Sequence, residues 1–239
     1  MKSYLSKLVP VACLCLLPMS GALAANLISD GGFEQPTAGP GGLNSGYLLY
    51  HVGDTINGVW SVVGSSVGNV AISPSSEYTI GISNIVITFP SQEGSQFLDL
   101  TGTADNGGQT GVSQSFSTIS GHLYSLSFYV GDINTPNWTP HQGNGIVNVL
   151  LNGSPFQTAV NSTFSGNTIA WQQFNYTFTA VGATTTLEFL NEVPFGVGNN
   201  GLDNVVVNDI TVPEPQTWGL LAVGLGFLWT RKNVRATAV

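Results

Sequence analysis

The sequence predicts an all-β domain built as a two-sheet sandwich. The first observation is a strict alternation of residues in short runs, as in 171–178, where Phe174, Tyr176 and Phe178 fall on one face of an extended chain. The second observation is the regular separation of these runs by turn residues, such as the Asn-Gly pair at 152–153. Period two with aromatic residues is typical of strands that bury one face, and many short strands at this spacing indicate a sandwich.

The predicted strands follow one another through the body of the chain, and no segment carries a helical period. Leu126 and Phe128 share one face of their run, as do Leu187 and Phe189, with Glu188 on the opposite face. Trp60 and Trp171 lie within such runs, so we expect both in the core. The predicted strands are residues 47–52, 59–63, 67–72, 82–89, 96–100, 112–117, 123–130, 146–151, 171–178, 186–190 and 205–210.

The first segment of the chain is typical of a secretory signal peptide. Lys2 and Lys7 give it a positive start, residues 8–19 are apolar, and an Ala-Leu-Ala site ends at Ala24. This order predicts export and cleavage after Ala24. The alternative is a buried helix of the core.

Both cysteines, Cys13 and Cys15, fall within this predicted signal peptide. The mature chain would therefore lack disulfides, thiolate metal sites and a cysteine nucleophile. The remaining body, residues 25–211, has about 185 residues, which is enough for one domain with a full core.

The charge pattern limits the classes of ligand. No lysine or arginine occurs between Lys7 and Arg231, and all 13 acidic residues lie in that interval. Nucleic-acid binding would lack its main attractive contribution, because phosphate contacts depend on lysine and arginine. Carboxylates that come together must be solvated, protonated or bridged by a cation such as Ca²⁺, which takes oxygen ligands.

The C-terminal segment, residues 212–239, has the layout of a sorting tail. An apolar helix is predicted over residues 217–230, and its apolar core at 218–229 would span about 18 Å as a helix, against about 30 Å for a hydrocarbon layer. This length predicts a temporary membrane anchor with a cytoplasmic basic end. The motif before the helix is Val212, Pro213, Glu214 and Pro215, and the basic residues after it are Arg231, Lys232 and Arg235.

This tail resembles the PEP-CTERM signal of Gram-negative bacteria that make exopolysaccharide. The resemblance implies recognition of residues 212–215 by an exosortase, transient anchoring in the inner membrane, and release to the cell surface or extracellular matrix.

Five motifs in the body resemble the galactose-binding-like jelly rolls, a group that includes many carbohydrate-binding modules. They are residues 26–34 (NLISDGGFE), 93–100 (EGSQFLDL), 112–116 (VSQSF), 124–128 (YSLSF) and 201–207 (GLDNVVV). The resemblance implies a two-sheet jelly-roll sandwich whose first and last strands lie near each other.

The same resemblance implies a structural Ca²⁺ between the two ends of the body, with Glu34 and Asp203 as ligands. The alternative from the residues themselves is a solvated Glu34 and a turn-forming Asp203.

A polar loop at residues 132–144 holds the candidate ligand-binding residues. Trp138 could stack against a sugar face, while Asp132, Asn137 and His141 could hydrogen-bond its hydroxyls. The alternative is that Trp138 folds back to cover an edge of the sandwich.

Support for catalysis is thin. Glu188 and Glu192 could imitate the paired carboxylates of a glycosidase, but Glu188 is expected to face solvent from a strand. The sequence therefore predicts a non-catalytic surface or matrix protein that binds glycan. The alternatives are a purely structural matrix protein and, with less support, a secreted glycan hydrolase.

Overall fold

The structure is a computed structural model that describes residues 25–39, 46–64, 68–80, 85–103, 109–134, 142–164, 166–194 and 199–211, except for the side chains of residues 76–80. The predicted signal peptide with its cleavage site at Ala24 lies outside the described residues. The predicted sorting tail, residues 212–239, lies outside them as well. Within the described part of the chain, no helix is long and apolar enough to cross a membrane.

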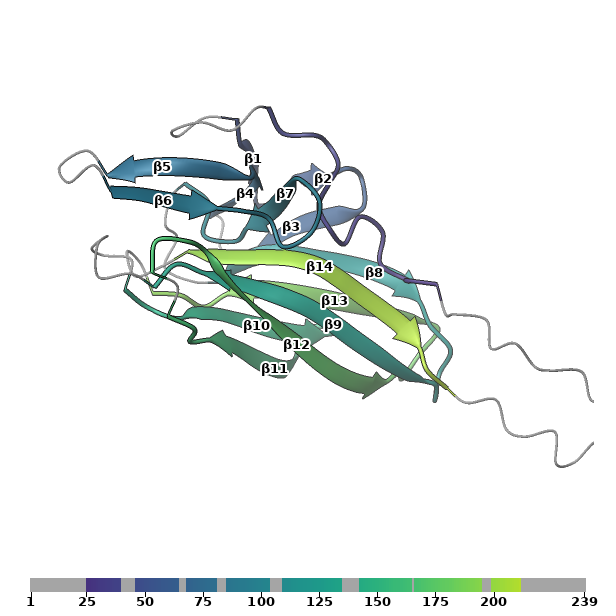
Figure 1. Cartoon of the computed structure of the whole chain (residues 1–239). Helices are drawn as coiled ribbons and strands as arrows, with labels where there is room; N and C mark the ends of the chain where they lie inside the picture. Colours follow the sequence, from purple (N-terminus) through teal and green to yellow (C-terminus); the bar gives the residue numbers. More distant parts are fainter. Residues whose placement is uncertain are drawn as a thin grey trace, which may run out of the picture.

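The described residues form an all-β domain (Figure 1). Its strands are β1 (Leu48–His51), β2 (Thr55–Ile56), β3 (Trp60–Gly64), β4 (Asn69–Pro74), β5 (Ser76–Ile80), β6 (Ile85–Phe89), β7 (Gln96–Asp99), β8 (Thr110–Ser117), β9 (Leu123–Asp132), β10 (Gly145–Leu151), β11 (Ser154–Asn161), β12 (Ala170–Thr179), β13 (Thr184–Asn191) and β14 (Asn200–Asp209).

Two six-stranded antiparallel sheets make a jelly-roll sandwich, which confirms the predicted fold class. The first sheet has the order β1-β4-β7-β14-β9-β12, and the second has the order β11-β10-β13-β8-β3-β2. Strands β5 and β6 form a separate hairpin, seen beside β1, β4 and β7 at the upper left of Figure 1. Most neighbours within each sheet are distant in sequence, so the sheets depend on long-range pairing.

The main core lies between the sheets and is filled by the apolar faces that the alternation predicted. Trp60 is completely buried, with its ring centroid 5.3 Å from that of Phe33 and 6.4 Å from that of Phe189. Phe128 packs edge-on against Phe189 at 4.9 Å. Phe178 is buried as well. Burial of this apolar core is the main source of stabilisation, and the aromatic rings bury the largest area per side chain.

The predicted strands are confirmed within a few residues, but three strands were not predicted. Strands β2 and β5 are short, and β5 pairs only with β6. Strand β11 lies at the edge of the second sheet and exposes most of its residues. An edge strand of this kind needs little apolar alternation, so its sequence carries a weak signal.

A second apolar cluster covers the outer face of the first sheet. It contains Ile87, Phe89, Phe97, Ile133 and Ile169, with Trp171 packed against it. Trp171 was expected in the core, and it belongs to this outer cluster rather than to the space between the sheets. A Cβ atom at Gly131 would lie 2.8 Å from the Trp171 ring, so glycine is needed on the strand beneath it.

The two ends of the body lie side by side, as the jelly-roll resemblance implied. The backbone N–H of Leu27 donates to the carbonyl of Val207 at 2.8 Å, and that of Val205 donates to the carbonyl of Gly31 at 2.9 Å. The approach is so close that a Cβ atom at Gly31 would lie 2.1 Å from the Val205 oxygen. This contact brings Glu34 and Asp203 into one region.

Candidate functional site

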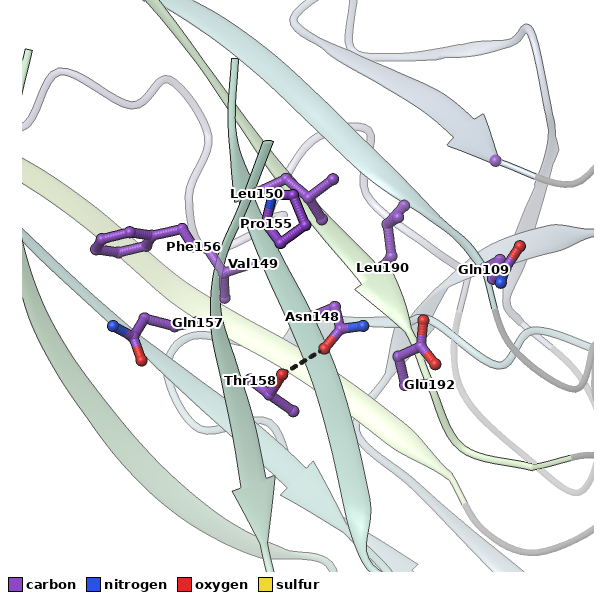
Figure 2. Close-up of a pocket in the computed structure, with 11 residues that line it drawn as sticks. Gln109, Asn148, Val149, Leu150, Pro155, Phe156, Gln157, Thr158, Leu190 and Glu192 are labelled. Carbon is purple, nitrogen blue, oxygen red and sulfur yellow. Dashed lines mark hydrogen bonds between the residues drawn. The ribbon is translucent and has the colours of Figure 1, made fainter. Parts of the chain in front are cut away.

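A groove of about 700 Å³ lies on the outer face of the second sheet, over β10, β11 and β13 (Figure 2). The volume falls in the range of sites for small ligands. The groove is lined by Gly64, Gln109, Asn148, Val149, Leu150, Pro155, Phe156, Gln157, Thr158, Leu190 and Glu192.

Strand register brings the polar centre of the groove together. Asn148 on β10 stands opposite Thr158 on β11 and Leu190 on β13. The Thr158 hydroxyl donates to the Asn148 side-chain oxygen at 2.6 Å, as Figure 2 shows, and this bond fixes the orientation of the amide. All three residues point away from the core, because side chains alternate along a strand and the adjacent Val147, Ala159 and Phe189 are buried between the sheets.

The rest of the groove has an aliphatic floor and polar side chains at its edges. Leu150, Leu190 and Pro155 supply apolar surface, and Gln109 and Glu192 supply polar groups at one end (Figure 2). An apolar floor with a few fixed polar groups is the usual composition of a small-ligand site.

The aromatic residue of the groove belongs partly to the core. The Phe156 ring lies 6.0 Å from the Tyr176 ring and 6.4 Å from the Phe178 ring, both edge-on. It packs against the main core as a partly buried residue. A ligand would therefore meet mainly aliphatic side chains here rather than an aromatic platform.

Among the described residues, the groove carries a negative charge that no lysine or arginine balances. Glu192 is the only ionisable residue in the described part of its lining. The sequence places no lysine or arginine between Lys7 and Arg231, so no such residue can reach the groove from the described part of the chain. Its hydrogen-bonding groups suit neutral hydroxyls and amides, and they offer nothing to balance a negative charge.

Of the residues predicted to bind ligand, the structure describes only Asp132, which does not line this groove. Asp132 ends β9 and is completely buried. Trp138, His141 and Asn137 lie outside the described residues, so their proposed role stays a prediction. The groove could not be predicted from the sequence because its lining comes from several separate segments. The only available signal was the polar residues at outward positions of the predicted strands at 146–151 and 186–190.

Glu34 and Asp203 approach each other through a shared loop at residues 92–96. The Glu34 carboxylate accepts the backbone N–H groups of Ser95 at 2.9 Å and Gln96 at 3.2 Å, and the Ser95 hydroxyl at 2.8 Å. Glu34 therefore ties the N-terminal segment to this loop.

Asp203 holds the other side of the same loop from the last strand. Its carboxylate accepts the backbone N–H groups of Gln92 at 3.0 Å, Glu93 at 3.1 Å and Asn204 at 2.7 Å. Burial raises the pKa of Asp203 to about 7, the three N–H donors oppose this rise, and the nearby Glu34 carboxylate adds to it. Both carboxylates thus act as clamps on the loop.

This geometry bears on the calcium site expected at Glu34 and Asp203. Each oxygen of the two carboxylates already accepts at least one hydrogen bond. The pair therefore fits a hydrogen-bonded clamp better than a calcium centre, and calcium at these two residues stays a prediction.

Neither a protein-family model nor the sequence of a curated protein matches this chain. Three of the solved structures with a similar chain course are compared with this chain by TM-score, sequence identity and coverage of the two chains. A candidate sugar-binding protein from Bacteroides thetaiotaomicron VPI-5482 has a TM-score of 0.42 and 10% identity, covering 77% of this chain and 100% of that one. TmCBM61 in complex with beta-1,4-galactotriose has a TM-score of 0.40 and 14% identity, covering 78% and 99%.

The third is the CBM22-1 xylan-binding domain of Paenibacillus barcinonensis Xyn10C, with a TM-score of 0.37 and 14% identity, covering 70% of this chain and 95% of that one. The strand pairing of this chain establishes its fold, and the residues of the groove define its candidate site.

Proposed function

We propose that this protein is an exported, non-catalytic glycan-binding protein that holds a neutral polysaccharide in the groove of the second sheet. The observation that carries the proposal is the composition of the groove. The aliphatic side chains of Leu150 and Leu190 lie beside the fixed amide of Asn148, the hydroxyl of Thr158 and the carboxylate of Glu192. A sugar presents C–H faces and neutral hydroxyls, which are the matching groups.

The charge of the chain narrows the class of glycan. The formal net charge is −8, and the described residues of the groove include a carboxylate and no cationic side chain. A polysaccharide rich in uronic acids would meet repulsion and find no arginine or lysine to pair with. Neutral polymers of hexoses or pentoses are therefore the favoured ligands.

The placement of the two glutamates, Glu188 and Glu192, argues for binding rather than hydrolysis. Glycosidases hold two carboxyl groups about 5 to 9.5 Å apart, one on each side of the scissile bond. Of the two glutamates, only Glu192 lines the groove.

Substitutions in the groove should weaken glycan binding without unfolding the protein. Glu192→Ala and Asn148→Ala each remove a polar contact, so each should raise the Kd by about 2- to 10-fold, from about 0.5 to 1.5 kcal/mol per hydrogen bond. Binding of the full chain to a glycan array, followed by calorimetric titration of the best neutral hit, measures the effect.

Glu188→Ala is the matched control because Glu188 lies on β13, on the same face as the groove residue Leu190, but not in the groove lining. Equal weakening by the control would place the ligand elsewhere. No binding to any array glycan would favour the structural matrix protein, and release of reducing sugar ends from a bound glycan would favour the hydrolase.

The proposal includes sorting by the C-terminal tail. It is supported by the motif at 212–215, the short apolar segment and the basic residues after it. Replacing Pro213, Glu214 and Pro215 with alanine should leave the tail uncleaved in a host with an exosortase. Accumulation of the longer form in the membrane fraction, detected by mass, is the expected result, and normal processing would contradict it. Alanine at Thr230 is a control that keeps the motif.

A further inference from the structure

Asp132 is a buried carboxylate without a hydrogen-bond donor of good geometry. Its side chain is completely buried at the end of β9, and neither carboxylate oxygen has a hydrogen-bond partner. The backbone N–H groups of Ile133 and Gly145 lie near enough to favour the ionised form, but burial outweighs them and raises the pKa to about 7. An unpaired buried carboxylate is costly, so its presence needs a physical explanation.

Asn200 presents a second unpartnered oxygen beside it. Asn200 begins β14 and stands directly opposite Asp132 in the β9–β14 pairing. Its side-chain nitrogen donates to the carbonyl oxygen of Ile146 and, at 2.7 Å, to the side-chain oxygen of Asn191. Asn191 is held in turn, because the same oxygen accepts the N–H of Val193 at 3.0 Å.

These bonds fix which atom of the Asn200 amide is the oxygen. A carbonyl such as that of Ile146 can only accept, so the atom facing it must be the NH₂ group. The remaining atom, Oδ1, is completely enclosed and has no donor. If the Asn200 amide were rotated by half a turn, its oxygen would face the carbonyl oxygen of Ile146, and both atoms are acceptors. The hydrogen bonds of the NH₂ group therefore leave Oδ1 without a partner.

Gly145 shows that the two side chains border one small region. A Cβ atom built at Gly145 would lie 3.0 Å from Asn200 Oδ1 and 3.2 Å from Asp132 Cβ. It would also lie 3.2 Å from the carbonyl oxygen of Gly131. A carboxylate, an amide oxygen and a backbone carbonyl are thus gathered beside a residue without a side chain.

The protein supplies no cationic side chain to balance this region within the described residues. Lysine and arginine do not occur between Lys7 and Arg231. His51 and His122 are both engaged elsewhere, in pairs with Asp54 and Asp209. The atoms that could bind a cation in this region are all oxygens, and hard divalent cations prefer oxygen ligands.

We propose that Asp132 and Asn200 bind a calcium ion through their side-chain oxygens. Calcium accepts carboxylate, amide and carbonyl oxygens in flexible geometry, whereas zinc prefers nitrogen and sulfur ligands. The ion neutralises the Asp132 carboxylate and joins the end of β9 to the start of β14. This site is separate from the Glu34–Asp203 clamp, where every carboxylate oxygen already accepts a hydrogen bond, and it is independent of glycan binding.

The test is thermal unfolding of the full chain at pH 7.5 with calcium chloride and with a chelator. Calcium at about 100 times its Kd should raise the Tm by about 5 to 10 °C. Asp132→Asn should lose this response. In chelator, Asp132→Asn should be at least as stable as the parent, because the substitution removes a buried unpaired charge. A variant that had lost the calcium response only because its fold was destabilised would be less stable than the parent in chelator.

Three further variants separate the possible outcomes. Glu34→Gln and the exposed Asp54→Asn should keep the calcium response, and Asn200→Ala should weaken calcium affinity by about tenfold in calorimetric titration, as expected for loss of one ligand. Absence of a calcium response in the parent, which would mean that water satisfies these oxygens, overturns the proposal. So does a response that survives Asp132→Asn, or one that depends on Glu34 and not on Asp132 and Asn200.

Discussion

Raising the pH from 4 to 8 in the presence of a chelator is expected to destabilise this protein. Asp132 and Asp203 have folded-state pKa values of about 7, against 3.8 when unperturbed, and burial is the main cause for both. Their contribution to stability is therefore complete below pH 4 and is lost as the pH rises through 7, because each buried group must then ionise. At 1.36 kcal/mol per pKa unit, the loss is at most about 4 kcal/mol per group.

Chemical denaturation at several pH values measures this effect. Asp132→Asn should remove roughly half of the pH dependence, because one of the two groups no longer titrates, whereas the exposed Asp54→Asn should leave the curve unchanged. Calcium should flatten the same curve if it binds ionised Asp132. A free energy of unfolding that rises steadily between pH 4 and 8 in chelator would show that these two carboxylates are solvated rather than buried.

Replacing Trp60 with alanine is expected to be the most damaging single substitution in the core. Trp60 is completely buried between the sheets and contacts Phe33 and Phe189. Loss of so large a side chain costs about 3 to 5 kcal/mol. The Trp60 indole also donates to the Asp30 carbonyl at 3.0 Å, so the substitution leaves that carbonyl without this donor.

Thermal unfolding should register this loss as a fall in Tm of about 6 to 20 °C, at about 2 to 4 °C per kcal/mol for a chain of this size. Phe164→Ala is a suitable control, because 68% of the Phe164 side chain is exposed and its removal should cost little. A Trp60→Ala protein with the parent Tm would mean that the ring does not fill the space between the sheets.

Much of the fold could be predicted from the sequence because local alternation determines which face of a strand is buried. The outward position of Glu188 and the inward positions of Leu187 and Phe189 follow from period two alone, and the structure confirms them. Trp171 shows the limit of this reasoning. Its strand pattern indicated burial, but the β5–β6 hairpin that contributes to its cluster could not be foreseen from that pattern.

The candidate sites were less predictable because their residues are neighbours only across strands. Asn148, Thr158 and Glu192 meet in the groove through the pairing of β10 with β11 and β13. Asp132 was predicted at the start of a ligand-binding loop, and its burial opposite Asn200 at the end of β9 could not be read from that loop. Strand order and register are set by long-range contacts, which alternation within one strand does not encode.

The sequence by itself determined that the body is all-β and that no lysine or arginine occurs between Lys7 and Arg231. Both properties are local or compositional, so they hold whatever the arrangement of the strands. Only the tertiary structure decided which outward side chains share a groove, and which carboxylates are clamped by N–H groups or left without a donor. Those properties depend on which distant strands lie side by side, and the collective burial of the core between the two sheets selects that arrangement.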